Sequence, residues 1–387
     1  MFDFDKEINR RNNNSYKWNC SENELPMWVA DMDFDTAPKI KEAIIKRANE
    51  GALGYSTTPD ALYNSYINFW SRRHHVKFEK EWMIFSIGVV ASISSIVRSM
   101  TKIGDNVLIS SPVYNIFYNS IINNKRTILS SDLIYENGNY HLDFTDLENK
   151  MKDEKTTLMI LCNPHNPIGK IWTKEELAKI GHLANKYHVL ILSDEIHCDI
   201  IDPPYEYVPF LSVNEECANN SITTIAPSKC FNIAGLQSSM IVCKNDEIRK
   251  KVERGLNTDE CAEGNVFSIE PVIKAFDESE DWLNELNIYL YENKKIFKEY
   301  VEKEIPLLHI VPSHATYLLW VDVSKITDDA KDLCAFIRKA TGLWITSGEV
   351  YGSNGKSFFR INLATQRKNV IDGMHRLKQG IELYMQK

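Results

Sequence analysis

Short apolar runs rich in β-branched residues recur through the middle of the chain. They lie at residues 105–110, 157–162, 189–194, 222–226 and 239–243. Unbroken runs of this kind are typical of strands that are buried on both faces. Polar segments with helical spacing separate several of them, and one begins with a capping box, Thr173 followed by Glu176 three residues later. The alternation predicts an α/β domain with a mostly parallel sheet.

The pattern changes after about residue 244, where long charged helical stretches begin. Strand-like segments follow at 314–323 and 358–364, and an amphipathic helical pattern closes the chain. These features predict a smaller α+β domain. We therefore expect an N-terminal segment that contributes to the small domain (1–45), a large domain (46–280) and a C-terminal small domain (281–387).

Composition narrows the class of protein and of partner. The chain has 387 residues, of which 43% are hydrophobic and 25% charged, as in globular proteins. A net charge of −8 argues against nucleic acid as a partner, and no apolar run reaches the roughly 18 residues of a membrane span. The polar N-terminus is unlike a signal peptide, and eight scattered cysteines lack a metal-binding spacing. We expect a cytoplasmic protein with reduced thiols and no metal, membrane or nucleic-acid partner.

Polar and aromatic side chains follow several of the predicted strands. They are Tyr114, Asn166, Asp194 and Lys229. Ligands of open α/β sheets bind beyond the carboxyl ends of the strands, so we expect these side chains to line one edge. Gly88 precedes a helical pattern, and a glycine turn that leads into a helix offers free N–H groups to a phosphate.

Each of these residues taken alone has an ordinary structural explanation. A lysine near a strand end is most often a solvated charge, and an aspartate there is most often a turn former. His197, close behind Asp194, is more often a satisfied polar residue than a catalyst. The combination is more specific, because pyridoxal 5′-phosphate (PLP) needs a lysine, a carboxylate for its ring nitrogen, an aromatic ring and a phosphate cradle.

The sequence resembles the fold-type I PLP enzymes of the aspartate aminotransferase superfamily, and within them the MalY/PatB group of cystathionine β-lyases and C–S lyases. The resemblance covers nearly the whole chain. It rests on LPMWVADMDFDTAP (25–38), GALGYSTTP (51–59), GVV (88–90), SPVYNIFY (111–118), NPHNPIGKIWTKEEL (163–177), SDEIHCDI (193–200), APSKCFNIAGLQ (226–237) and FFRINLA (358–364). It implies a large domain with a mostly parallel seven-stranded sheet flanked by helices, a smaller α+β domain, and a homodimer with shared active sites.

The resemblance implies a role for each residue around the cofactor ring. Lys229 matches the lysine that binds PLP covalently and carries protons during catalysis. Asp194 matches the partner of the ring nitrogen, and Tyr114 matches the aromatic ring that stacks on the pyridine. Asn166 and His197 fall where the family contacts the 3′-oxygen of the cofactor.

The same resemblance implies how the phosphate and the substrate are bound. Val89 and Val90 would offer backbone N–H groups to the phosphate, with Ser228 as a further contact. Tyr55 matches a tyrosine that reaches the phosphate of the neighbouring subunit. Arg360 matches the arginine that binds the substrate α-carboxylate, for which its planar pair of donors is suited.

Two positions depart from related enzymes. Many aminotransferases place a phosphate-binding arginine where this chain has Gln237, whereas the MalY/PatB group does not. Asn115 stands where some C–S lyases carry a second tyrosine, so Lys229 is the expected proton carrier. Gln237 therefore favours the lyase group and leaves the charged partner of the phosphate unassigned.

The leading hypothesis is β-elimination on L-cystathionine or related cysteine S-conjugates, which gives a thiol such as homocysteine, pyruvate and ammonia. An aminotransferase acting on an L-amino acid uses the same residues and is the nearest alternative. An alternative of another class is a regulatory protein that binds a transcription activator in the manner of MalY.

Overall fold

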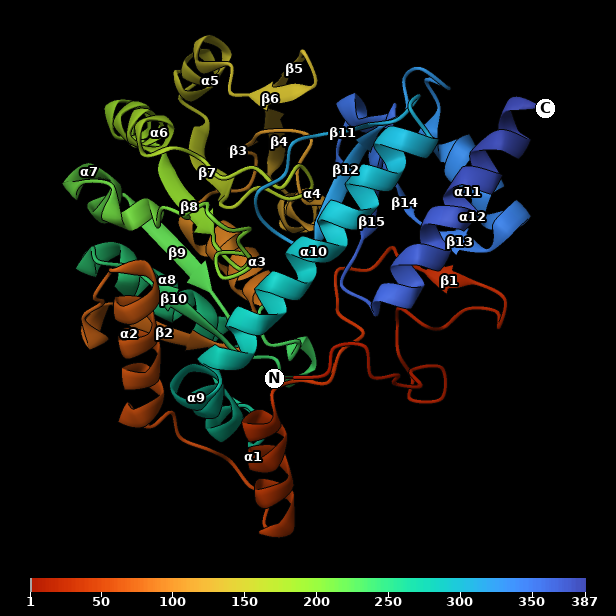
Figure 1. Ribbon diagram of the computed structural model, residues 1–387. Coiled ribbons are helices and arrows are strands. Elements are labelled where there is room, and N and C mark those ends of the chain that lie inside the picture. Colours follow the sequence, from red (N-terminus) through yellow and green to blue (C-terminus); the bar gives the residue numbers. More distant parts are fainter. Residues whose placement is uncertain (1) are drawn as a thin grey trace.

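A seven-stranded sheet forms the centre of the computed structural model, which describes residues 2–387 (Figure 1). In spatial order its strands are β2 (Met83–Ser86), β10 (Ser239–Val242), β9 (Ser221–Ile225), β8 (Leu190–Asp194), β7 (Thr156–Cys162), β3 (Asn106–Ile109) and β4 (Thr127–Ser130). The strand pairs are parallel except those made by β10, which runs antiparallel to β2 and β9. The predicted mostly parallel sheet is confirmed.

Helices cover both faces of this sheet, which explains the unbroken apolar runs of its strands. Leu158 and Ile160 of β7 share a core with one set of helices, whereas Met159 and Leu161 face the other set. The first set is α3 (Val89–Met100), α4 (Asn115–Asn123) and α8 (Asp246–Thr258). The second is α5 (Phe144–Met151) and α6 (Lys174–Lys186), next to the short α7 (Glu215–Asn219).

Local signals in the sequence set the beginnings of two of these helices. The predicted capping box is present at α6, where Thr173 accepts a hydrogen bond from the Glu176 N–H and donates its own N–H to the Glu176 carboxylate. Gly88 directly precedes α3 with a φ of 151°, a conformation that other residues rarely adopt. Helix α3 therefore begins at the edge of the sheet where the strands end.

The N-terminal helices pack beside the large sheet rather than under its centre. These are α1 (Pro38–Asn49) and α2 (Asp60–His74), both of which contact α9 (Ile269–Glu278). Their apolar side chains share a core with β9 and β10 through residues such as Phe69, Phe276 and Met240. None of the helices in the described part of the chain is long and apolar enough to cross a membrane.

A second, four-stranded sheet lies in the C-terminal part of the chain. Its order is β11 (His309–Ile310), β12 (Leu318–Asp322), β15 (Phe358–Asn362) and β14 (Thr346–Ser347), packed with α11 (Ala330–Thr341) and α12 (Arg367–Met385). The long helix α10 (Glu280–Glu304) runs from the neighbourhood of α9 to this sheet (Figure 1). The N-terminal strand β1 (Leu25–Pro26) pairs with β13 (Leu343–Trp344), so the first part of the chain joins the last. The limits of the three predicted parts stay a prediction.

Buried charges hold the N-terminal segment, which has little regular secondary structure. The Lys17 ammonium is 0% exposed and lies 2.7 Å from an Asp33 carboxylate oxygen. The same carboxylate accepts hydrogen bonds from Arg10 at 2.8 Å and from the Trp18 indole at 2.7 Å. Because strand pairing here is limited to β1, these charge-assisted bonds fix the path of the segment towards the sheet edge.

We expect Asp33→Asn to lower the free energy of unfolding at about pH 7 by about 3 kcal/mol, because the buried Lys17 would lose the carboxylate at 2.7 Å and retain the more distant Asp31 carboxylate at 3.9 Å. Burial opposes ionisation of Asp33, but Lys17, Trp18 and Arg10 together lower its pKa below the ordinary value. A carboxyl with a lowered pKa stabilises the fold above its unfolded pKa of about 3.9, and this stability is lost as pH falls through the folded pKa.

Urea unfolding of wild type and variant therefore tests the pair. The difference between them should shrink as pH falls from about 7 towards about 3. Asp35→Asn removes an exposed ion pair with Lys6 and serves as the matched control, with an expected change below about 0.5 kcal/mol. A pH-independent difference would contradict the assignment.

Candidate active site

A cavity of about 300 Å³ opens at the edge of the large sheet where β7 and β8 end. It brings together residues from the first turn of α3 and from the segments that follow β3, β7, β8 and β9. Eight of the residues nominated from the sequence line it: Val89, Val90, Tyr114, Asn166, Asp194, His197, Ser228 and Lys229. Strand ends far apart in the chain thus supply one site, and the individual cofactor roles of these residues stay predictions.

The amine of Lys229 is held by a backbone carbonyl. Its Nζ donates a hydrogen bond to the Ala30 oxygen at 2.7 Å. Burial lowers the pKa of Lys229 to about 8, with Arg360 acting in the same direction and with Asp31 and Asp194 opposing. A lysine with this pKa is partly a free amine near neutral pH, which is the form that acts as a nucleophile or a base.

Asp194 closes strand β8 and is 3% exposed. Burial raises its pKa to about 7, the Ile196 N–H opposes this with a hydrogen bond of 3.2 Å, and the adjacent Glu195 adds to the rise. Within residues 2–387 no cation pairs directly with this carboxylate. A protonated ring nitrogen beside Asp194 would supply the missing counter-charge.

His197 lines the same cavity as a neutral imidazole. Burial, together with the positive charges of Lys229 and Arg360, lowers its pKa to about 3. Its Nδ1 is buried and has no hydrogen-bond partner in the described part of the protein. A buried polar atom of this kind is costly unless a ligand pairs with it.

Arg360 on β15 is not among the residues that line the cavity, but it hydrogen-bonds to Asn166, which is. One terminal nitrogen of its guanidinium donates to Asn166 Oδ1 at 3.1 Å and the other to the Trp28 carbonyl at 3.0 Å. The side chain is 5% exposed, and its Nε has no partner among the described residues. A buried guanidinium bound only to neutral oxygens is suited to receive a carboxylate.

The opposite end of the cavity is formed by the first turn of α3. The first N–H groups of a helix have no acceptor within the helix, so Val89 and Val90 present donors and a positive dipole end. Ser228 and Gln237 line the cavity with them, and Lys229 is the only lysine or arginine that does so in the described chain. The charge of a phosphate here would be met by the helix terminus rather than by an arginine.

Tyr114 and Tyr55 have different surroundings. Tyr114 directly precedes α4, and burial raises its pKa to about 12, so its hydroxyl stays protonated at neutral pH. Tyr55 is fully exposed between α1 and α2 and does not line the cavity. Its expected role towards the neighbouring subunit stays a prediction, because one chain is described.

Sequence reasoning missed the part that the segment before α1 plays in the site. The Ala30 carbonyl accepts hydrogen bonds from both Lys229 and the buried Tyr317 hydroxyl, the latter at 3.1 Å. The Trp28 carbonyl receives Arg360. These contacts use backbone oxygens, which no side-chain pattern in the sequence indicates. Tyr317 falls within the strand-like pattern at 314–323, which does not distinguish it from its apolar neighbours.

Comparisons with known proteins agree over nearly the whole chain. A family described as aminotransferase class I and II matches residues 23–377. Cystathionine beta-lyase PatB of Bacillus subtilis (strain 168) is 36% identical over 385 residues, which is 98% of this chain and 99% of PatB. A PLP-bound putative aminotransferase from Clostridium difficile 630 is 38% identical with a TM-score of 0.96, over 98% of this chain and 100% of that one. The PLP-bound C–S lyase of Staphylococcus hominis is 32% identical with a TM-score of 0.93, over 98% of both chains.

We expect Asp194→Asn to stabilise the cofactor-free chain at alkaline pH, although it alters the site. The folded pKa of about 7 lies above the unfolded value of about 3.9, so ionisation of Asp194 destabilises the fold increasingly as pH rises between these values. The gain in free energy of unfolding should be about 4 kcal/mol at about pH 8 and close to zero at about pH 4.

Denaturant unfolding of the cofactor-free protein at the two pH values measures this gain. Asp328→Asn, at an exposed position, is the control and should change neither value. A variant less stable than wild type at about pH 8 would show that the Asp194 carboxylate is better satisfied than the geometry indicates.

Proposed function

The chain belongs to the family of class I and II aminotransferases, and within this family we propose that it is a PLP-dependent C–S lyase. The reaction would be β-elimination on L-cystathionine or a related cysteine S-conjugate, giving a thiol such as homocysteine, pyruvate and ammonia. The observation that carries the proposal is the meeting of Lys229, Asp194 and the α3 N-terminus in one cavity. The fold is that of the fold-type I PLP enzymes, as the resemblance of the sequence implied.

The unpaired groups of the cavity fit PLP from ring to phosphate. Asp194 lacks a counter-charge that a ring nitrogen would supply, and His197 has a buried nitrogen without a partner. With Asn166, His197 would hold the 3′-oxygen, and Tyr114 would face the ring. When bound, PLP supplies an acceptor for the electron pair left behind when a proton leaves the substrate Cα.

The phosphate would be held by the opposite end of the cavity. Val89 and Val90 would donate backbone N–H groups to it, and Ser228 would add a hydroxyl. Tyr55 of a second copy would complete this end, which requires a homodimer with shared sites. The full exposure of Tyr55 and the 53% exposure of Leu53 support a contact at this surface.

The chain's own residues would place and move the proton. Arg360 would bind the substrate α-carboxylate with its paired donors, which orients Cα towards Lys229. Lys229 would take the Cα proton onto Nζ as a free amine. The sulfur then leaves Cβ as a thiolate, and hydrolysis of the remaining aminoacrylate gives pyruvate and ammonia.

An aminotransferase remains the second candidate, because the structure from Clostridium difficile that is 38% identical carries that description. Both reactions begin with loss of the Cα proton to the lysine and differ only in the steps after it. A lyase expels a group from Cβ, whereas an aminotransferase returns the proton to the cofactor side. Gln237, which the resemblance ties to the lyase group, favours the first reaction.

Incubation of the purified protein with L-cystathionine and no keto acid distinguishes the two. We expect steady release of pyruvate and free thiol, measured with lactate dehydrogenase and a thiol reagent. Lys229→Ala should lower this rate by at least about 10³-fold, since it removes both the covalent anchor and the base. Conversion of PLP into its amine form without pyruvate would instead identify an aminotransferase.

Substitution of Arg360 tests how the substrate is bound. Arg360→Met should raise KM for cystathionine by about 100-fold, equivalent to about 3 kcal/mol of lost carboxylate binding, with a smaller fall in kcat. Arg72→Met, on the exposed side of α2, is the matched control and should leave both constants unchanged. An unchanged KM for Arg360→Met would show that another group binds the carboxylate.

A further inference from the structure

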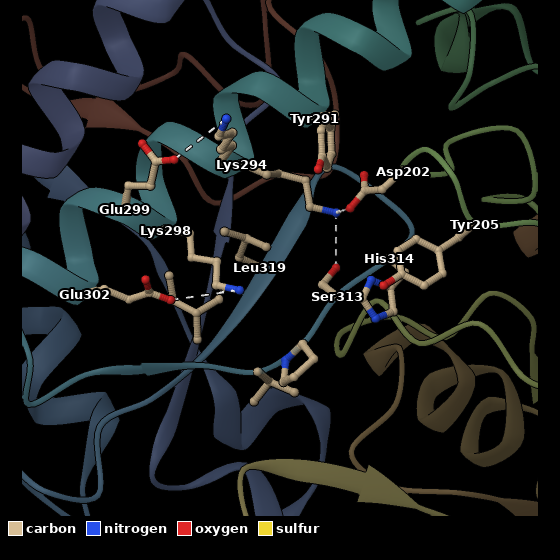
Figure 2. A pocket seen from close by; sticks show the side chains of 14 residues that line it. Asp202, Tyr205, Tyr291, Lys294, Lys298, Glu299, Glu302, Ser313, His314 and Leu319 are labelled. Atoms are coloured by element: carbon tan, nitrogen blue, oxygen red, sulfur yellow. Dashed lines mark hydrogen bonds and ion pairs between the residues drawn. The ribbon is translucent and has the colours of Figure 1, made fainter.

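A second cavity, of about 440 Å³, lies between α10, β12 and the segment that follows β8 (Figure 2). It shares no lining residue with the first cavity within the described chain. A buried ion pair lies at its wall, where Lys294 Nζ is 2.6 Å from Asp202 Oδ2. The two side chains are 6% and 8% exposed, so water screens the pair poorly. Lys294 belongs to α10, and Asp202 belongs to the segment that follows β8 of the large sheet. The pair therefore links the long helix to a segment that leaves the large sheet.

The Lys294 ammonium has its full set of acceptors. It donates to Asp202, to Ser313 Oγ at 3.2 Å and to the Thr316 carbonyl at 3.2 Å. Figure 2 shows the side chain directed towards Asp202 and Ser313. An ammonium has three N–H groups, so none is left for a ligand in this cavity. The ion pair therefore acts on the protein itself, and in particular on residues 313–316.

Residues 313–316 hold the loop that carries Asn166. The N–H groups of His314 and Ala315 both donate to the Gly169 carbonyl, at 2.9 and 3.1 Å. Gly169 has a φ of 65°, and a Cβ at this position would come within 2.0 Å of Ser313 Oγ. The two segments are thus in direct contact at Gly169, which lies three residues after Asn166. A shift of Ser313 would therefore move the loop that carries Asn166.

The same residues hold the segment that carries His197. The Thr316 N–H donates to the Ile200 carbonyl at 2.8 Å, and the Asp202 N–H donates to the His314 carbonyl at 2.9 Å. Thr316 has a φ of 65°, which is strained for a β-branched residue and persists only where neighbours fix it on both sides. Ile200 fixes its N–H, and Lys294 fixes its carbonyl.

We propose that Lys294 is a positioning residue for the active site: by holding residues 313–316 it fixes the two loops that carry Asn166 and His197. Its effect on kinetics rests on the proposed function, whereas its effect on PLP binding does not. Tyr317, next to the held segment, extends the connection to the Ala30 carbonyl that receives Lys229. Lys294, which lies outside the active-site cavity, thus holds the Asn166 loop, the His197 segment and the neighbourhood of Tyr317.

Three variants separate positioning from simple stability. Lys294→Met leaves Asp202 buried without a counter-charge, so its urea midpoint should fall. The double variant Lys294→Met/Asp202→Asn has no buried charge, so its midpoint should return to near the wild-type value. Lys298→Met, one turn further along α10 in the same cavity and in a loose, exposed pair with Glu302, is the matched control.

The double variant decides the proposal, because its fold is stable while Thr316 and Ser313 have lost their donor. We expect KM for cystathionine and the dissociation constant of PLP from the holoenzyme each to rise about tenfold, with kcat changed less. Lys298→Met should match wild type in every measurement. Ser313→Ala keeps both charges and should give the same changes at about threefold, which provides a test if the double variant does not fold.

A double variant with the wild-type midpoint, wild-type KM and wild-type PLP affinity would overturn the proposal and leave Lys294 as a structural ion pair. Equal losses in Lys298→Met would overturn it as well, since in the described chain the lysine hydrogen bonds to Ser313 and Thr316 come from Lys294 and not from Lys298. If wild type itself released no pyruvate, the lyase proposal would fail, and the PLP dissociation constant would still decide the role of Lys294.

Discussion

Burial of Lys229 and Asp194 in one cavity destabilises the charged form of each, and much of the chain serves to keep them there. The pKa of the lysine falls to about 8 and that of the aspartate rises to about 7 for the same reason, removal from water. Neither group has a direct counter-charge within the described chain, so both are set for a ligand that brings one. Such a site has to be closed on several sides by segments that are themselves firmly held.

The closing segments come from distant parts of the sequence. The stretch before α1 supplies the carbonyls of Trp28 and Ala30, and the Lys17–Asp33 pair anchors that stretch. Strand β15 supplies Arg360, which reaches back to Asn166. The site is therefore made at the junction of the two sheets, where a change in either one alters the distance between Arg360 and Lys229.

The sequence predicted what is encoded locally. Apolar runs marked strands β3, β7, β8, β9 and β10, although not β2 or β4 of the same sheet. The capping box marked α6, and the strand ends marked the edge that carries Asp194 and Lys229. It did not reveal that β10 runs antiparallel to its neighbours, because a strand that is apolar on both faces has the same pattern whichever way it runs. Backbone carbonyls and the buried Lys294 escaped notice because their partners are fixed only by the tertiary fold. The role expected for Tyr55 stays a prediction, because its partner would belong to a second copy.

Two buried ion pairs, Lys17–Asp33 and Lys294–Asp202, each hold a carboxylate that lies outside the helices and strands. A buried ion pair gives no more stability than a well-packed apolar pair of similar size, so stability alone does not account for either. What a charge pair adds is a strict choice of geometry, because displacement of one partner leaves the other unpaired in a low dielectric. Each pair fixes a segment whose backbone contacts the catalytic loops or the lysine itself. Ion pairs thus fix the segments between the layers, and apolar packing holds each layer together. The two together keep Lys229 and Asp194 in fixed positions in the lining of an open cavity.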